Sequence, residues 1–103
     1  MKIIKCLSEK IEDELNDADE YIDLAMRWKT DEPDTAQVFY ELSLEEMNHV
    51  EKLHKEVSEV IEDYRKEHGE PPKDMMTLYD YLHEKHIGKA TKIRVKQGMF
   101  KSE

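Results

Sequence analysis

The chain has 103 residues, a length that suits one small domain. Its net charge of −9 is unevenly spread, because residues 1–88 contain 11 basic and 24 acidic residues whereas residues 89–103 contain five and one. The acidic character of residues 1–88, which we call the acidic body, argues against nucleic acid as a partner. We see no signal peptide or membrane-spanning stretch. We therefore expect a cytoplasmic protein without a membrane partner, which fits its single cysteine, Cys6.

The composition favours helices. Charged residues make up 40% and hydrophobic residues 38% of the chain, and there are only three glycines and three prolines. Apolar residues recur at spacings of three and four through most of the sequence, and nowhere do they alternate over the length of a strand. We predict an all-α single domain covering residues 1–103.

The first predicted helix covers residues 2–28. Its apolar residues form one stripe: Ile3, Leu7, Ile11, Leu15, Ala18, Tyr21, Ile22, Ala25 and Trp28. At about 100° per residue, Glu14 lies inside this stripe, whereas Glu12 lies about 160° away. A buried carboxylate requires a partner, either a metal ion or a basic residue such as Lys10.

The second predicted helix covers residues 35–68. It follows a break at Pro33, where Asp34 and Gln37 resemble a capping box, and it ends before Gly69. Eight of its apolar residues form a stripe within about 60° of Glu46. They are Phe39, Leu42, Val50, Leu53, Val57, Val60, Ile61 and Tyr64.

Glu46 and His49 form a Glu-x-x-His pair on this helix, with His49 about 60° to one side of Glu46. Two further pairs with the same spacing begin at Glu51 and Asp80. Those carboxylates lie about 140° and about 160° from the apolar stripes of their helices, so we expect them to face water.

The short connection makes the two helices antiparallel neighbours. Glu14 lies about 15 residues before the turn and Glu46 about 12 after it, so at about 1.5 Å per residue they are level within roughly one turn. Inward carboxylates with a histidine three residues on are the ligand set of di-iron and di-manganese proteins in helical bundles. The alternative is a protonated or ion-paired glutamate inside an ordinary core.

A shorter third helix is predicted over residues 75–95, followed by a basic tail over 96–103. Its apolar face contains Met75, Leu78, Tyr79, Leu82, His86 and Ile93. Gly88 predicts fraying or a bend, and His83 and His86 are candidates for further ligands. We expect the basic tail to dock against an acidic body, of this chain or of another.

Residues 11–57 resemble the ferritin-like superfamily, in particular the small encapsulated-ferritin type. The resemblance consists of Glu14 with Tyr21 seven residues on, and of the segment Leu44 to His49. It implies a protomer that carries half of a ferritin motif as a helical hairpin, so that two protomers complete a four-helix bundle and its metal centre. It also implies that Glu14, Glu46 and His49 bind iron.

The function that this resemblance implies is iron handling by oxidation of Fe²⁺ to Fe³⁺ at a dinuclear site in a homodimer or higher homo-oligomer. Manganese or zinc are other metals that suit these ligands. An encapsulating shell protein is a further implied partner, although residues 89–103 match no shell-targeting peptide. Two alternatives stay open, a non-catalytic helical assembly module and a peroxide-reducing enzyme similar to rubrerythrin.

Overall fold

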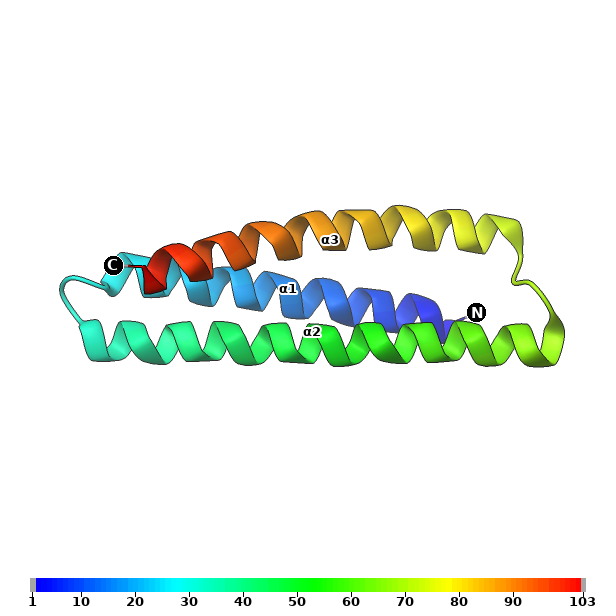
Figure 1. Cartoon of the computed structure of the whole chain (residues 1–103), viewed down its shortest axis with the longest axis horizontal. Helices are drawn as coiled ribbons and strands as arrows, with labels where there is room; N and C mark the ends of the chain where they lie inside the picture. Colours follow the sequence, from blue (N-terminus) through cyan, green and yellow to red (C-terminus); the bar gives the residue numbers. More distant parts are fainter. Residues whose placement is uncertain (1, 103) are drawn as a thin grey trace.

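The computed structural model describes residues 2–102, which form three long helices and no strand. α1 covers Lys2–Trp28, α2 covers Pro33–His68 and α3 covers Lys73–Lys101. α1 and α2 form an antiparallel hairpin, and α3 returns alongside it parallel to α1 (Figure 1). The resulting rod measures 56 × 19 × 18 Å. The predicted all-α fold is therefore confirmed for the described residues, and none of these helices combines the length and apolar character needed to cross a bilayer.

The ends of α2 follow from proline and glycine. Pro33 opens the helix, two residues earlier than predicted, and the preceding Glu32 makes no side-chain cap, so the predicted capping box is wrong. Asp34 lies in the first turn, where its charge complements the helix dipole. At the other end Gly69 has a φ of 78° and donates its N–H to the carbonyl of Arg65 at 3.0 Å. Such a left-handed angle is available to glycine at little cost.

The prediction of a short third helix with a separate basic tail is wrong. α3 has 29 residues and continues through Gly88 to Lys101, so most of the expected tail is helical. Two effects stabilise this extension: burial of Phe100, and pairing of Lys96 Nζ with carboxylates of both Asp19 and Asp23 at 2.9 Å. The expected docking of basic residues on the acidic body occurs within the chain.

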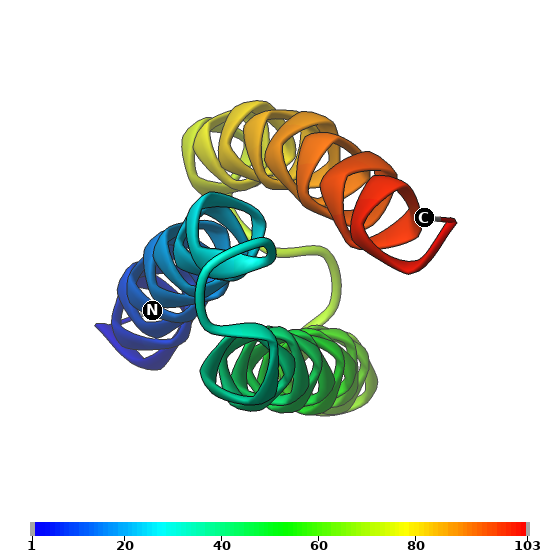
Figure 2. The same cartoon turned by 90° about the vertical axis from the view of Figure 1, so that its left-hand side faces the viewer.

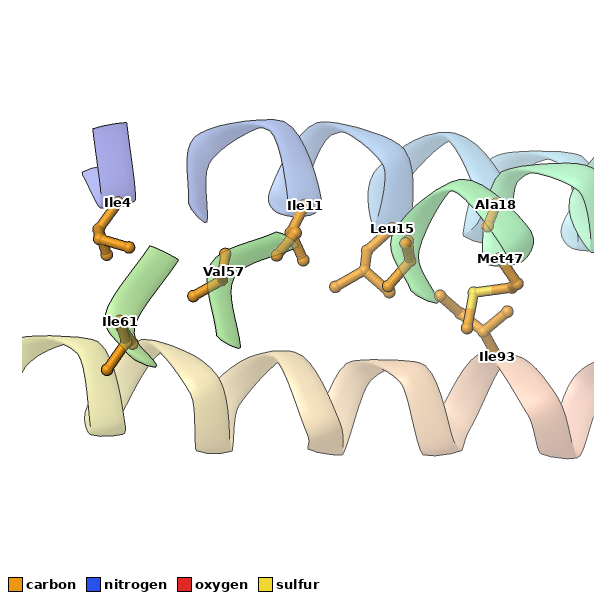
Figure 3. Close-up of a cluster of buried hydrophobic side chains, with 9 residues drawn as sticks. Ile4, Ile11, Leu15, Ala18, Met47, Val57, Ile61 and Ile93 are labelled. Atoms are coloured by element: carbon orange, nitrogen blue, oxygen red, sulfur yellow. The ribbon is translucent and has the colours of Figure 1, made fainter. Parts of the chain in front are cut away.

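The buried side chains of α1 and α2 follow alternating spacings of three and four residues, with one step of seven between Val50 and Val57, which is the pattern of a packed helical seam. They are Ile4, Ser8, Ile11, Leu15, Ala18, Ile22 and Ala25 on α1, and Ala36, Tyr40, Ser43, Met47, Val50, Val57 and Ile61 on α2. On α3 the buried residues are His86, Ile93, Gln97 and Phe100. Figure 3 shows Ile93 meeting side chains of the other two helices in the larger core cluster.

The predicted stripe on α1 merged two neighbouring faces of the helix. Ile3 and Trp28 were expected in the core but are 50% and 37% exposed. Leu7 and Tyr21 are only half-buried. The seam runs through Ile4 instead, which leaves these residues on its flank.

A buried polar layer joins all three helices. The hydroxyl of Ser43 donates to the carbonyl of Ala18 at 2.7 Å, and the side-chain amide of Gln97 donates to the same hydroxyl at 2.9 Å. Buried polar groups are tolerated when they are hydrogen-bonded, and a mismatched alignment would leave them unpaired. This layer therefore fixes the position of α3 along the hairpin.

α3 covers one flank of the hairpin and leaves the other open. It lies beside α1 and further from α2 (Figure 2). Its lysines contact α1 on the covered flank, Lys89 at Glu12 and Lys96 at Asp19. The opposite flank, which we call the open face, contains the half-buried side chains of Leu7, Glu14 and Tyr21 on α1 and of Phe39, Leu42, Glu46, Leu53 and Val60 on α2.

Candidate metal centre

Glu14, Glu46 and His49 come together on the open face, at the level predicted from their distances to the turn. Nδ1 of His49 lies 3.6 Å from a carboxylate oxygen of Glu14 and 3.7 Å from one of Glu46. One potential ligand atom from each residue lies within 4.8 Å of the other two. Among residues 2–102 this is the one group of three or more histidine, cysteine, aspartate or glutamate side chains whose arrangement could hold a metal ion.

The three side chains lie close together but form no hydrogen bonds with one another. Separations of 3.6 and 3.7 Å exceed an ordinary hydrogen bond. The second carboxylate oxygen of Glu46 is buried, and within the described chain it has no hydrogen-bond partner. An unsatisfied buried polar atom destabilises a fold by about 1–3 kcal/mol, and by more when it is charged. A cation at this position would remove that penalty.

The cluster sits at the edge of the core. The side chain of Glu46 is 17% exposed, that of Glu14 27% and that of His49 56%. At about 100° per residue, the seven buried residues of α2 are centred roughly 70° from Glu46, on the side away from His49. The predicted stripe around Glu46 thus combined the core with the open face, and His49 is less buried than its expected inward position suggested.

Two residues beside the cluster were not identified from the sequence. A cavity of about 360 Å³ is lined by Glu14, His49, Lys52, Leu53 and Glu56. Lys52 and Glu56 follow His49 by three and seven residues, which is the spacing that places side chains on one helix face. That spacing is the signal by which they could have been found.

The aromatic neighbour of the cluster on α1 is a packing residue. The ring of Tyr21 stacks on that of Phe39 across the hairpin, with centroids 6.3 Å apart. This contact joins the α1 and α2 parts of the open face. Nδ1 of His49 faces the carboxylate of Glu14 at 3.6 Å, and no ion pair between Glu14 and Lys10 is found among the described residues.

The two other candidate ligands, His83 and His86, lie elsewhere. Nδ1 of His83 shares a hydrogen bond with Nε2 of His54 on α2, and Nε2 of His86 lies 3.0 Å from a carboxylate oxygen of Glu12 on α1. All of these groups belong to the flank covered by α3. The structure therefore does not bring His83 or His86 to the cluster of Glu14.

The two comparison pairs behave as their helical phase predicted. Glu51 is 66% exposed and pairs with Arg94 of α3 at 2.6 Å, and Asp80 is exposed. The sequence pattern assigned no role to His54, the histidine three residues after Glu51. His54 is half-buried against His83, a contact that depends on where α3 docks.

Comparison of the chain with models of protein families, with curated proteins and with solved structures gave no match.

Proposed function

We propose that this chain is a ferritin-like dimetal-carboxylate protein that binds iron through Glu14, Glu46 and His49 at the interface of two copies and oxidises Fe²⁺ to Fe³⁺. The observation that carries the proposal is the buried carboxylate oxygen of Glu46, which has no hydrogen-bond partner among residues 2–102 and lies next to two further potential ligands. Ionic groups are retained in such places when a partner compensates their burial.

The donor set suits iron. Carboxylate oxygens with an imidazole nitrogen are ligands that iron and manganese share, and zinc competes for them. Bound iron supplies the one-electron chemistry, with dioxygen or peroxide as the acceptor. The protein supplies negative charge through Glu14 and Glu46, a neutral nitrogen donor through His49, and a partly enclosed position on the open face.

A second copy would complete the site. One protomer offers two carboxylates and one imidazole, half of the four carboxylates and two histidines that a ferritin-like centre uses. A two-fold partner doubles the set, because an isologous interface presents the same residues from both sides. Two copies of Glu14 and Glu46 then carry four negative charges, which match the four positive charges of two Fe²⁺ ions.

The open face supports this pairing. Its apolar side chains flank the cluster along both helices and are half-buried in the monomer: Leu7, Tyr21, Phe39, Leu42, Leu53 and Val60. α3 packs on the other flank, so it does not obstruct the pairing of two hairpins into a four-helix bundle.

Native mass spectrometry with and without Fe²⁺ tests the proposal. We expect a dimer that gains two iron ions under anaerobic conditions and develops the absorbance of Fe³⁺ when dioxygen is admitted. Glu46→Gln keeps the size of the side chain and should remove both effects. Dimers that gain no mass at saturating Fe²⁺ would instead identify the open face as a non-catalytic assembly surface.

A further inference from the structure

The flank covered by α3 contains a second group of histidines with no role in the proposed metal centre. Nε2 of His54 and Nδ1 of His83 lie 2.6 Å apart, and their ring centroids are separated by 4.4 Å. Tyr79, one turn before His83, stacks on the His83 ring with centroids 5.6 Å apart. This contact joins α2 to the N-terminal half of α3.

The third histidine of the group joins the same half of α3 to α1. The side chain of His86 is 7% exposed, and its Nε2 lies 3.0 Å from a carboxylate oxygen of Glu12. The other oxygen of Glu12 lies 3.3 Å from Nζ of Lys89. Glu12 is thus held between two groups of α3.

The two halves of α3 are attached to the hairpin in different ways. Beyond Gly88 the helix buries Ile93, Gln97 and Phe100. Before Gly88 its one buried side chain is His86, and Leu78 and Tyr81 are 59% and 63% exposed.

A largely apolar cavity of about 640 Å³ separates this N-terminal half from α1 and is lined by Ile4, Leu78, Tyr79, Leu82 and His86, among others. This half also packs Met76 and Tyr79 against the larger core cluster, and the polar contacts of the histidines add to that attachment.

We propose that the contact between His54 and His83 is a proton-operated latch, which holds residues 73–87 of α3 on the hairpin at neutral pH and releases them on acidification. Two imidazole nitrogens share one hydrogen bond when one donates and the other accepts. When both rings are protonated both nitrogens are donors, so the bond is lost and two cations are left in contact. The closed latch excludes the doubly protonated state.

The surrounding charges agree with this direction. Burial lowers the pKa of His54, and His83 and His86 lower it further. Burial also lowers the pKa of His86, against the opposing effect of Glu12 on α1, while Lys85 and His83 on α3 lower it further.

A histidine whose pKa is lower in the closed form than its ordinary value of about 6.5 stabilises that form above about pH 6.5. This stabilisation is lost as the pH falls below that value.

Both ends of the released segment have a backbone that permits movement. Gly88 is an exposed residue within α3 where an added Cβ would meet nothing within 4 Å, and a glycine inside a helix keeps more conformational freedom than other residues. At the other end the segment follows the linker at residues 69–72, which begins at Gly69. We therefore expect local opening of the N-terminal half without loss of the C-terminal half.

Amide hydrogen exchange of the metal-free protein at pH 7.5 and pH 5.0 tests the latch, with rates corrected for intrinsic exchange. Residues 77–87 should lose protection by up to about 30-fold for each histidine that gains a proton on opening. Residues 89–101 of the same helix serve as the internal reference and should keep their protection.

The double variant His54→Asn and His83→Asn removes both rings of the latch and should reduce the difference between the two pH values to the part that His86 contributes. His68→Asn, at an exposed histidine that pairs with Glu67, is the matched control and should behave as the wild type. Unchanged protection of residues 77–87 in the wild type, equal loss in both halves, or an undiminished pH response in the double variant would each overturn the latch. None of these outcomes depends on whether the protein binds iron.

Discussion

α2 carries two Glu-x-x-His pairs of identical spacing, and the structure gives them opposite surroundings. Glu46 and His49 lie on the open face with Glu14, where a buried carboxylate oxygen has no partner within the described residues. The second pair lies five residues further along the helix. Its Glu51 is exposed and pairs with Arg94, and its His54 contacts α3. Five residues turn a helix by about 140°, which moves a pair from one flank of the hairpin to the other.

The difference shows that the spacing of a motif defines which groups are neighbours, while the helix face decides what they meet. One pair faces the region where a second copy would pack, and the other faces α3 of the same chain. The first therefore has a potential role in ligand binding, and the second in holding the fold together.

Loss of the proposed iron binding is the largest effect that we expect to separate the two pairs. Glu46→Gln and His49→Asn each remove a proposed ligand, and we expect either to weaken Fe²⁺ binding by more than about 100-fold, beyond the 10- to 100-fold range of changes next to a ligand. Anaerobic titration followed by calorimetry measures this. Glu51→Gln and His54→Asn are the controls, and equal losses from both pairs would refute the assignment of faces.

For the dependence of stability on pH, we expect the second pair to have the larger effect. Because the pKa of His54 is lowered in the folded protein, its contribution is present above about pH 6.5 and decreases as the pH falls below that value. The limit is about 1.4 kcal/mol per pH unit, and the effect is smaller here because His54 is half-buried. Urea denaturation at pH 7.5 and 5.5 measures this, and an undiminished pH dependence in His54→Asn would contradict it.

The sequence predicted the hairpin and its cluster because both depend on local periodicity. The first helix begins and ends as predicted, and counting residues from the turn placed Glu14 level with Glu46. The extent of α3 was harder to predict. Glycines and basic residues weaken its local pattern, and its stability comes from contacts with distant residues of α1. The partner of His54 could not be predicted for the same reason, since a helix pattern does not specify which flank a third helix covers.

Gly88→Ala tests whether the contrast between the two halves of α3 involves this glycine. The added methyl group has free space, so the variant should stabilise the helix by about 1 kcal/mol through propensity alone. It should also reduce the exchange of residues 77–87 at pH 5.0. A destabilised variant in thermal unfolding would indicate that Gly88 has a packing role that the structure does not show.

Removing the carboxylate of the second pair should have the smallest effect. Glu51→Gln breaks an exposed ion pair with Arg94, and such pairs contribute about 0.2–1 kcal/mol to stability. The change in the free energy of unfolding should shrink further at high salt. A loss well above 1 kcal/mol would mean that Glu51 has a structural role on the covered flank.

The central claim is that the metal centre is shared between two chains, and sedimentation of a dilution series with and without Fe²⁺ or Mn²⁺ tests it most directly. Each metal ion that bridges the open faces should stabilise the dimer by about 2.7 kcal/mol at a hundredfold excess over its dissociation constant. The midpoint of dissociation should then move to about 100-fold lower protein concentration for each bridging ion, and Glu46→Gln should remove that shift. A monomer that binds two metal ions with full affinity would contradict the shared site.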